Sequence, residues 1–393
     1  MSRILFINSV CNGSTGTICK TLYKAAVEAG HECCIAYGRG EAPKGFKTIK
    51  IGNKLDIYLH VLKARLFDAS GFGSKHATKE FIKKIDEFKP DIIHLHNIHG
   101  YYVNIEILFK YLKAHPEIKK IWTLHDCWAF TGHCPHFEYE KCEQWKNECK
   151  KCVRRNEYPK SLVDRCNRNY WLKKSTFTNV DNLMLVSPSN WLMNLIKDSF
   201  FKEYPIEVIN NGVDTSIFKH TESNIKERYG IKNKKVILGV ASVWDKKKGL
   251  DTFIELSKQL DNEYQIVLIG LNKKQIKKLP SNIIGIIRTE KVEELVKWYS
   301  AADVYFNPTL EDNYPTVNLE AIACGTPVVT FNTGGSPESA YASKKNIIYM
   351  KNINEILNKL INISHRKKNN NNNKMGLIYM TNNYLKNYVE EDF

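Results

Sequence analysis

The sequence predicts an α/β protein of two domains, each built on a doubly wound parallel sheet. The first observation is length, because 393 residues are too many for one hydrophobic core of ordinary size. The second is that short apolar runs, which fit buried parallel strands, alternate with helical stretches. The third is that this alternation occurs twice, with a break near residues 201–210. No solenoid-type repeat of 20–50 residues is present.

The first series opens with the apolar run RILFINSV and continues through a small-residue loop, CNGSTGT. A helix is expected after this loop, and Gly30 is a typical residue to end it. A second helix, NIEILFKYLKAH, separates two later strands. We expect the strands at residues 3–10, 33–38, 91–97, 120–126 and 182–189.

The second series repeats the pattern, with strands expected at residues 235–242, 264–270, 282–288, 303–308 and 326–331. The break between the two series predicts a first domain at residues 1–204 and a second at residues 205–375. The segment SHRKKNNNNNK at residues 364–374 is of low complexity and predicts a flexible loop. Residues 376–393 are expected to contain a final helix.

Composition limits the class of partner. The formal net charge of +16 favours anionic partners such as a phosphorylated ligand or an acidic membrane face, although solvated lysines alone could account for it. No Lys/Arg-dense block interleaved with aromatic residues is present, which disfavours nucleic acid. No apolar run reaches eighteen residues, and the opening does not resemble a signal peptide. These features and the odd number of cysteines, 11, predict a cytoplasmic location rather than a disulfide framework.

The stretch LEDNYPTVNLEAIACGTPVVTF carries the main candidate site. Asp312 falls in a loop after a strand, and Glu320 falls in the first turns of a helix that Gly325 ends. A helix start attracts phosphate, and nearby carboxylates can accept hydrogen bonds from sugar hydroxyls. The alternative is that acidic residues merely stabilise the helix start. The candidate donor-binding residues here are Asp312, Asn313, Tyr314, Pro315, Thr316, Val317 and Glu320.

This string resembles the signature of retaining glycosyltransferases of family four, which have the GT-B fold. That signature is a carboxylate, seven residues, then Glu-Ala and a tail like CGTPVV, and TGGSPE completes it. Asp312 stands where the family usually has Glu, so its carboxylate reaches one methylene less far. The resemblance implies two Rossmann-like domains that face a central cleft, with the nucleotide sugar mainly on the second domain. It also implies that the C-terminal helix crosses back to the first domain.

The segment GVASVWDKKKGLDTFIEL resembles the family's source of an Arg and a Lys for the donor diphosphate. Lys248 matches the Lys, Ser242 occupies the Arg position, and Lys246 or Lys247 is the candidate substitute. Cations facing a diphosphate stabilise it as it departs. The alternative is an ordinary solvated turn.

Two motifs in the first half extend the resemblance. In WTLHDCW, His125 matches the strand-end histidine that lies beside the donor sugar, although a core histidine bonded to Asp126 is the alternative. In NGSTGT, Gly16 is the candidate for close approach to phosphate, and a plain turn is the alternative. His125, Lys248 and Asp312 are therefore the predicted catalytic residues. Lower-ranked candidates for the acceptor side are His94, His96 and His99.

A cysteine-rich insertion at about residues 127–152 is a candidate structural zinc site. Four thiolates can hold zinc tetrahedrally, and reduced spare thiols are the alternative. No catalytic metal or other cofactor is implied by the resemblance. The candidate zinc ligands are Cys134, Cys142, Cys149 and Cys152.

The predicted activity is transfer of a sugar from a nucleoside diphosphate sugar to a hydroxyl of a glycan or lipid-linked acceptor, with retained configuration. The resemblance places this activity in the biosynthesis of surface polysaccharide such as capsule or lipopolysaccharide. The alternatives are a GT-B-like epimerase or phosphorylase, or a zinc-stabilised anion-binding protein without activity.

The segment KLDIYLHVLKARLFDASGF bears on location, because its apolar and basic residues have helical spacing. Lys54, Lys63 and Arg65 suit contact with an anionic membrane at the inner face of the cell, whereas a core-facing helix is the alternative.

Overall fold

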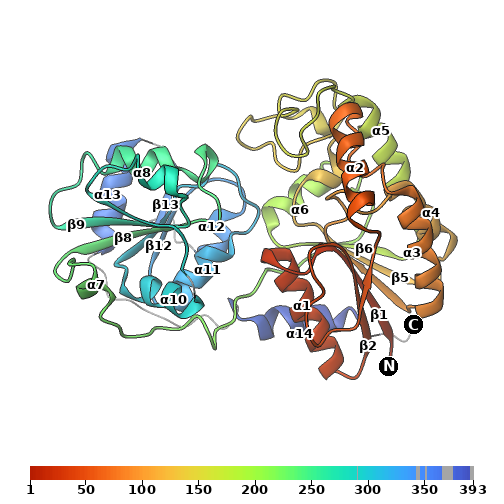
Figure 1. Cartoon of the computed structure of the whole chain (residues 1–393), viewed down its shortest axis with the longest axis horizontal. Coiled ribbons are helices and arrows are strands. Elements are labelled where there is room, and N and C mark those ends of the chain that lie inside the picture. The colour runs from red at the N-terminus through yellow and green to blue at the C-terminus, as the bar shows by residue number, and fades with distance from the viewer. Residues whose placement is uncertain (290, 342–345, 350–351, 365–374, 390–393) are drawn as a thin grey trace. The chain divides into compact units, whose positions relative to one another are not determined.

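The computed structural model describes residues 1–289, 291–341, 346–349, 352–364 and 375–389. It divides into two compact units (Figure 1). Unit 1 contains Met1–Ile209 together with the chain from Thr381 onward, and unit 2 contains Asn210–Met380. The expected domain boundary at residues 204 and 205 falls a few residues before Ile209. Apart from its first residue, the expected low-complexity loop at 364–374 lies outside the described residues.

Unit 1 is built on a seven-stranded parallel sheet in the order β3-β2-β1-β4-β5-β6-β7. The first strand lies in the interior, and successive strands add outward on each side of it. The winding direction therefore reverses between β1 and β4, which is where open α/β sheets bind ligands. The strands are β1 (Arg3–Val10), β2 (Glu32–Arg39), β3 (Thr48–Lys50), β4 (Ile92–Leu95), β5 (Lys119–Thr123), β6 (Leu183–Ser187) and β7 (Ile206–Val208).

The helices of unit 1 cover this sheet, and the first of them begins earlier than expected. It starts at Gly13 rather than after Thr17, and Asn12 before it has the extended backbone of an N-cap residue. The helices are α1 (Gly13–Glu28), α2 (Lys54–Phe67), α3 (Lys75–Phe88), α4 (Ile105–Ala114), α5 (Cys166–Phe177) and α6 (Asn190–Lys197), with short 3-10 turns η1 (Trp128–Phe130) and η2 (Gln144–Lys146).

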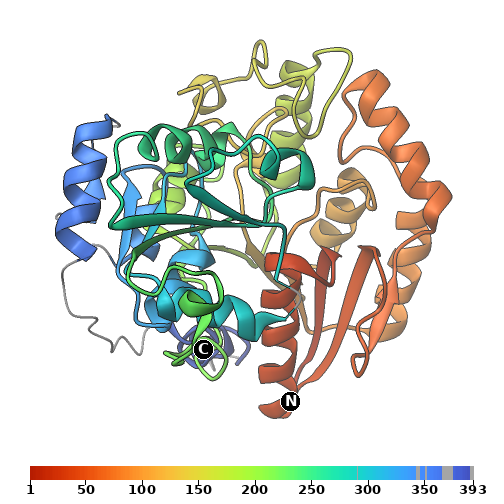
Figure 2. The same ribbon diagram turned by 60° about the vertical axis from the view of Figure 1, so that its left-hand side comes forward.

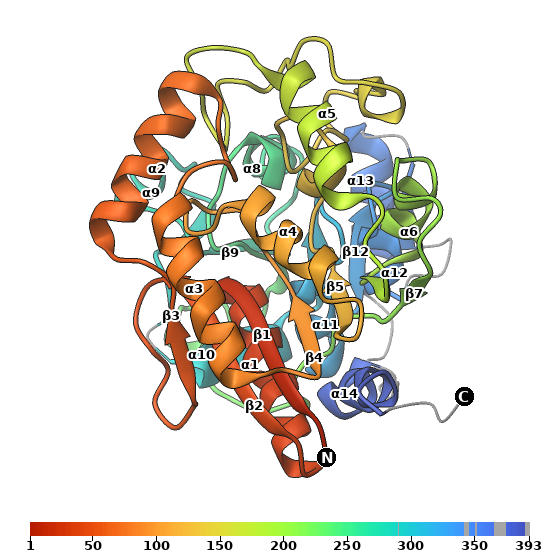
Figure 3. The same cartoon turned by 90° about the vertical axis from the view of Figure 1, so that its right-hand side faces the viewer.

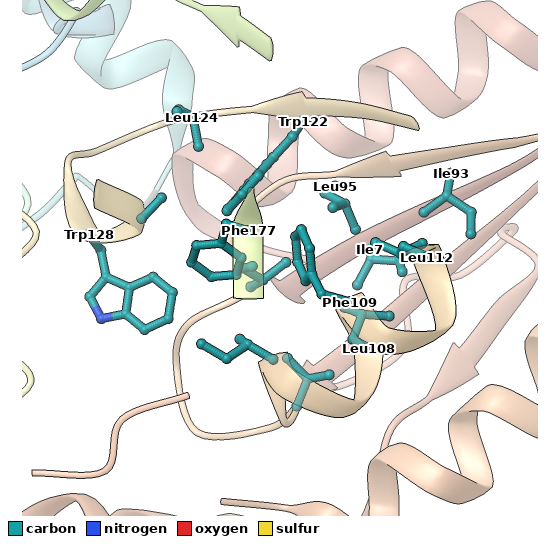
Figure 4. Packing of buried hydrophobic residues seen from close by; sticks show 14 of the residues in the cluster. Ile7, Ile93, Leu95, Leu108, Phe109, Leu112, Trp122, Leu124, Trp128 and Phe177 are labelled. Carbon is teal, nitrogen blue, oxygen red and sulfur yellow. The ribbon is translucent and has the colours of Figure 1, made fainter. Parts of the chain in front are cut away.

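Aliphatic and aromatic side chains together fill the core between the sheet and its helices (Figure 4). Trp122 of β5 packs edge-on against Phe177, with ring centroids 5.0 Å apart, and Phe109 packs 4.6 Å from Phe177. Burying aromatic rings of this size contributes strongly to stability. The strand β5 is thereby held rigidly, which matters because the candidate residue His125 follows it directly.

Unit 2 is built on a six-stranded parallel sheet in the order β10-β9-β8-β11-β12-β13. Its winding reverses between β8 and β11, so the same topological rule applies to it. The interior strands are almost completely buried, as the continuous apolar runs of the sequence predicted. The strands are β8 (Lys235–Val240), β9 (Tyr264–Ile269), β10 (Ile283–Ile286), β11 (Val304–Asn307), β12 (Val328–Phe331) and β13 (Ile347–Ile348).

Short helices connect the strands of unit 2. The two ends of the unit meet, because Val213 forms an isolated bridge with Gly376 and donates from its N–H to the Met375 carbonyl at 2.8 Å. The helical elements are α7 (Ile225–Arg228), η3 (Lys246–Lys248), α8 (Leu250–Leu256), α9 (Lys273–Ile276), α10 (Val292–Ala301), α11 (Thr316–Ala323), α12 (Ser336–Ser339), α13 (Ile353–Ser364) and α14 (Leu377–Lys386).

The last helix, α14, runs across the boundary at Thr381, and the residues after it contribute to unit 1. Tyr388 contacts His94 Nδ1 through its hydroxyl at 2.7 Å, and the Tyr384 hydroxyl lies 3.0 Å from Thr123 Oγ1. Both tyrosines are buried, so they are part of the packed interior of unit 1.

Candidate active site

The principal candidate site of unit 2 lies at the carboxyl ends of β8, β11 and β12. These three strands are neighbours in the sheet, and the winding reverses between the first two. The loops that leave them carry Lys248, Asp312 and the start of the TGGSPE segment respectively. Ligands of open α/β sheets bind at this position, so the fold brings three separately predicted motifs together.

The lysine loop after β8 is held in shape by its own cap. Asp245 accepts hydrogen bonds from the backbone N–H groups of Lys247 and Lys248, each at 2.9 Å. These bonds form the short turn η3, because an Asp before a helical turn satisfies its first N–H groups. The turn fixes the direction in which the two lysine side chains leave the backbone.

Three contacts join this loop to the carboxylate loop after β11. The Leu310 N–H donates to the Lys247 carbonyl at 2.7 Å, and Lys247 Nζ lies 3.3 Å from Glu311 Oε1. Lys248 Nζ donates to Asp312 Oδ2 at 2.6 Å. The two predicted motifs, 64 residues apart in sequence, thus form one structural unit.

Two glycines allow these loops to approach closely. Gly249 adopts φ +77°, and a Cβ atom there would lie 2.6 Å from the Pro308 ring. Gly334, from TGGSPE, adopts φ +56°, and a Cβ atom there would lie 2.0 Å from the Asp312 carbonyl oxygen. Only glycine adopts such a conformation and fits such a gap without strain. The three loops are therefore packed backbone against backbone.

The Lys248–Asp312 pair is only partly exposed. Burial opposes the charge on Lys248, but the nearby carboxylates, Asp312 first, outweigh it and raise the pKa of the ammonium. Lys248 is therefore charged throughout the physiological range. An ammonium has three donors, so Lys248 can hold Asp312 and still donate to another anionic group.

Glu320 has a different environment from Asp312. It lies on α11, its Oε2 accepts a hydrogen bond from the Tyr299 hydroxyl at 2.9 Å, and Tyr299 itself is buried on α10. Burial raises the pKa of Glu320 to about 7, and the Tyr299 hydrogen bond opposes this only in part. Glu320 is consequently poised between its neutral and ionised forms near neutral pH.

The start of α11 is fixed by a buried amide. Asn318 accepts a hydrogen bond from Asn307 Nδ2 at 2.8 Å and donates to Ser339 Oγ at 2.9 Å, so it connects α11 to β11 and α12. Thr333, three residues before Ser336 at the start of α12, has a buried Oγ1 without a hydrogen-bond partner among the described residues. Asn318 and Tyr299 were not predicted, because their contacts join separate elements and leave no local sequence signal.

The remaining predicted donor residues differ in exposure. Ser242 is exposed in the loop after β8, and Pro315 precedes α11, whose first turn contains Thr316 and Val317. Asn313 is buried. The ring of Tyr314 is also buried, in a cluster with Val213, Leu319 and Met375. Its contact with the donor stays a prediction.

Unit 1 holds a group of histidines at the carboxyl ends of β4 and β5. His125 Nε2 lies 3.0 Å from His96 Nδ1, and the two rings are stacked with an interplanar angle of 16°. Burial lowers the pKa of His125 to about 4, despite the opposing charge of Asp126. His125 is therefore neutral near pH 7 and can orient a polar group without adding charge.

Asp126, which the alternative interpretation pairs with His125, also contacts a second histidine, since its Oδ2 lies 2.8 Å from His99 Nε2. His94 is fully buried and bonded through both ring nitrogens, to Tyr388 and Thr123, so it cannot line a binding surface. The expectation that it faces the acceptor is wrong, since strand-end spacing does not reveal a partner 294 residues away.

Gly16 lies in the opening turns of α1, where the backbone of Cys11 occupies the space that a side chain would need. A Cβ atom there would lie 2.5 Å from the Cys11 carbonyl carbon. The close approach predicted at this glycine is therefore made by the protein's own backbone.

The four predicted zinc-binding cysteines line one small cavity in the insertion after β5. Cys134, Cys142, Cys149 and Cys152 border it, and Cys166 joins them. Cys134 donates a hydrogen bond to Cys152, which lowers the pKa of the Cys152 thiol. Within the described ranges, no three His, Cys, Asp or Glu side chains are arranged to hold a metal ion. The zinc site stays a prediction.

Comparison with known families decides the class of protein. Residues 15–217, more than half of the chain, match "Glycosyltransferase Family 4". The chain belongs to this family. Residues 234–365 of the glycosyltransferase match a second description, "Glycosyl transferases group 1". The enzyme is thus a glycosyltransferase, as the motifs predicted.

Relatives of this glycosyltransferase include a putative colanic acid biosynthesis glycosyl transferase, WcaC, of Escherichia coli K12. It is 24% identical over 354 residues, which cover 86% of this chain and 85% of WcaC. A processive diacylglycerol alpha-glucosyltransferase of Acholeplasma laidlawii is 27% identical over 160 residues, 37% of this chain and 47% of that protein.

Solved structures confirm the GT-B arrangement of two parallel sheets. Sucrose-phosphate synthase of Thermosynechococcus elongatus superposes with a TM-score of 0.70 at 14% identity, covering 99% of this chain and 98% of that one. Anabaena HepE in complex with UDP superposes at 0.68 and 14% identity, covering 98% and 99%. Within the described ranges of the glycosyltransferase, no helix is both long and apolar enough to cross a membrane.

Proposed function

We propose that this glycosyltransferase moves a sugar from a nucleoside diphosphate to a hydroxyl of a glycan or lipid-linked acceptor, with retained anomeric configuration. The observation that carries the donor assignment is the contact between Lys248 Nζ and Asp312 Oδ2 at the point where the unit 2 sheet reverses its winding. An ammonium beside a carboxylate offers a donor for phosphate and an acceptor for sugar hydroxyls.

Each residue then has a chemical role. Lys248 donates to the diphosphate and stabilises the charge that develops as the bond between the sugar C1 and the phosphate oxygen breaks. Asp312 accepts hydrogen bonds from the sugar, and Glu320 accepts them from the ribose. His125 orients the sugar. This role is supported by the family motif, by the neutral state of the His125 ring and by its hydrogen bond with His96.

The reaction balances without a covalent enzyme intermediate. The electron pair of the broken bond stays on the departing diphosphate, the acceptor oxygen bonds to C1 on the same face, and the acceptor proton passes to a departing phosphate oxygen. No carboxylate pair at the short separation used by retaining hydrolases was apparent from the sequence, which favours this path.

The proposed pathway is the biosynthesis of surface polysaccharide at the inner face of the membrane. Its support is the relative WcaC, which is described as acting in colanic acid biosynthesis and aligns over most of both chains. The proposed donors are UDP-sugars first, because HepE of similar fold was solved with UDP.

A panel of nucleotide sugars tests the donor assignment by thermal shift. A ligand present at a hundredfold over its dissociation constant stabilises the fold by about 2.7 kcal/mol. We expect Lys248→Ala and Glu320→Ala to abolish the shift and to lower kcat/KM about a hundredfold or more. The matched control is Lys258→Ala, which removes an exposed lysine of unit 2. Unchanged turnover in the first two variants would contradict the proposal.

Sugar release with and without acceptor separates the rival reactions. A transferase requires the acceptor hydroxyl, a phosphorylase would use inorganic phosphate, and an epimerase would change the donor without any acceptor. Inversion at the product's anomeric carbon would rule out the retaining path.

A further inference from the structure

Helix α2 turns an apolar face away from the core of unit 1. Only His60 and Ala64 of its residues are buried. His60 holds the inner face in place, because its Nε2 accepts hydrogen bonds from the Gly71 and Gly73 N–H groups at 3.2 and 3.1 Å. The large apolar residues that remain exposed, by 39% to 70%, are Leu55, Tyr58, Leu59, Leu62, Leu66 and Phe67.

Most of these residues form one stripe along the helix. Leu55, Leu59, Leu62 and Leu66 are separated by three or four residues, which places them on one side. This stripe faces opposite to Ala64, so it cannot be the core-facing side that the sequence left open as an alternative. Figures 2 and 3 show α2, in orange, at the margin of unit 1 and clear of its sheet.

A further exposed apolar residue lies beside the end of the helix. Leu162 is 65% exposed, and its N–H donates to the Arg65 carbonyl at 2.8 Å, so the loop that carries it is fixed beside the end of α2. Soluble monomers rarely expose a contiguous apolar surface of this kind without a partner.

Basic side chains border the stripe. With helical geometry, Lys63 lies along one edge and Arg65 along the other. The only acidic residue of α2, Asp56, is occupied, because its carboxylate accepts the Asn53 N–H in the capping box. Exposed leucines between cations are the pattern of a helix that lies in a membrane interface.

A groove of about 260 Å³ opens at the same end of the helix. Lys63 and Phe67 line it, and Lys75, Arg165 and Arg168 add three cations from neighbouring elements, against one carboxylate, Glu106. The Arg165 guanidinium also lies over the Phe67 ring, 5.5 Å from its centroid. The groove therefore combines an apolar wall with an excess of positive charge, as an anionic lipid headgroup requires.

We propose that α2 and this groove dock unit 1 on a bilayer that contains anionic phospholipid. The leucine stripe enters the boundary between headgroups and acyl chains, and the cations contact lipid phosphates. This inference deepens the membrane location under the proposed function, but its test needs no nucleotide sugar. Failure of vesicle binding and failure of sugar transfer are therefore separate results.

Vesicle co-sedimentation of the full chain tests the proposal. We expect binding to vesicles of phosphatidylcholine mixed with phosphatidylglycerol and little binding to phosphatidylcholine alone. Each cation near an anionic surface contributes about a fivefold change in affinity, so Lys63→Glu with Arg65→Glu should weaken binding more than tenfold. Leu59→Asn with Leu62→Asn should weaken it comparably, since the stripe no longer enters the interface.

Matched controls separate this surface from general charge and from misfolding. Lys84→Glu with Lys110→Glu makes the same charge change at exposed positions of α3 and α4 and should leave binding within twofold of wild type. All variants should keep the wild-type Tm, because the substituted side chains are exposed. Equal vesicle binding by wild type and both α2 variants would overturn the proposal. A concentration-dependent dimer that Leu59→Asn with Leu62→Asn abolishes, without vesicle binding, would assign the stripe to a second copy and also overturn it.

Discussion

Glu320 and Asp312 show how environment separates two carboxylates of one motif. Glu320 is largely buried beside Tyr299, which raises its pKa to about 7, whereas Asp312 is held directly by the Lys248 ammonium. The sequence identified both residues but could not reveal this difference, because Tyr299 lies on another helix and the burial depends on packing. The consequence is a titratable group at the proposed ribose contact.

Nucleotide-sugar affinity should depend on pH through Glu320. An ionised carboxylate accepts ribose hydroxyl groups better than a neutral one, so affinity should fall about tenfold per pH unit below about pH 7. Isothermal titration calorimetry with a nucleotide sugar measures this affinity at each pH. The diphosphate of the ligand has no terminal phosphate group, so the ligand itself does not titrate near pH 7. Glu320→Gln should bind more weakly and without the pH dependence. A pH-independent wild type would show that Glu320 does not contact the donor in its ionised form.

Two single residues show what the local sequence does not reveal about side-chain packing. Tyr314 is one of the predicted donor-binding residues, and its ring packs against Met375, which lies 61 positions later. His94 has the spacing of a strand-end site residue, yet Tyr388 covers it. Both contacts are made by residues after the second sheet. The sequence around Tyr314 and His94 does not indicate these contacts, although the family resemblance implied that the last helix returns to the first domain.

The loops of unit 2 depend on glycine at specific positions. Gly249 combines a left-handed backbone with close contact to Pro308, and it lies between the lysine turn η3 and α8. Any side chain there must push the β8 and β11 loops apart. The sequence shows only that Gly249 follows Lys248. The structure shows that the left-handed backbone and the contact with Pro308 require glycine at this position.

Gly249→Ala should destabilise the protein more than a comparable glycine change elsewhere. Gly230 is the matched control, with φ +70° and open space around its Cα. Gly230→Ala should cost about 1 kcal/mol for the left-handed conformation, and Gly249→Ala should cost about 1–3 kcal/mol more for the clash. Urea unfolding measures both, and donor affinity should fall only in Gly249→Ala. Equal costs would mean that the Pro308 contact relaxes freely.

Helix α2 illustrates the limit of periodicity as a predictor. Its apolar residues have helical spacing on more than one side, so the sequence could not decide which side faces the core. The orientation of α2 is fixed by His60, because its ring accepts two backbone hydrogen bonds and holds that side of the helix against unit 1. The regular strands, in contrast, were predictable because buried parallel strands are apolar on both faces.

The two units of the protein should respond to acid in opposite directions. In unit 1, burial lowers the pKa of His125 to about 4, so the unfolded chain binds a proton first and stability is lost as pH falls below about 6.5. In unit 2, the pKa of Glu320 is raised to about 7, so the folded state binds the proton first and stability rises as pH falls from about 7 to about 4.5. Each contribution is on the order of 3 kcal/mol.

Hydrogen exchange read by mass spectrometry resolves the two units in one experiment. Between about pH 7.5 and about pH 5, after correction for intrinsic rates, protection should fall in the unit 1 sheet and rise in the unit 2 sheet. Glu320→Gln is the control and should remove most of the rise. Parallel changes in both units would contradict the assignment of opposite proton linkage.

The bridge between Val213 and Gly376 has a practical consequence for dissecting the enzyme. Unit 2 is one continuous stretch, Asn210–Met380, that is closed near its ends by the bridge between Val213 and Gly376, whereas unit 1 is made of two stretches that are far apart in sequence. We therefore expect that unit 2 can be produced alone from a single open reading frame. For unit 1, a short glycine–serine linker between Ile209 and Thr381 would replace the deleted residues Asn210–Met380.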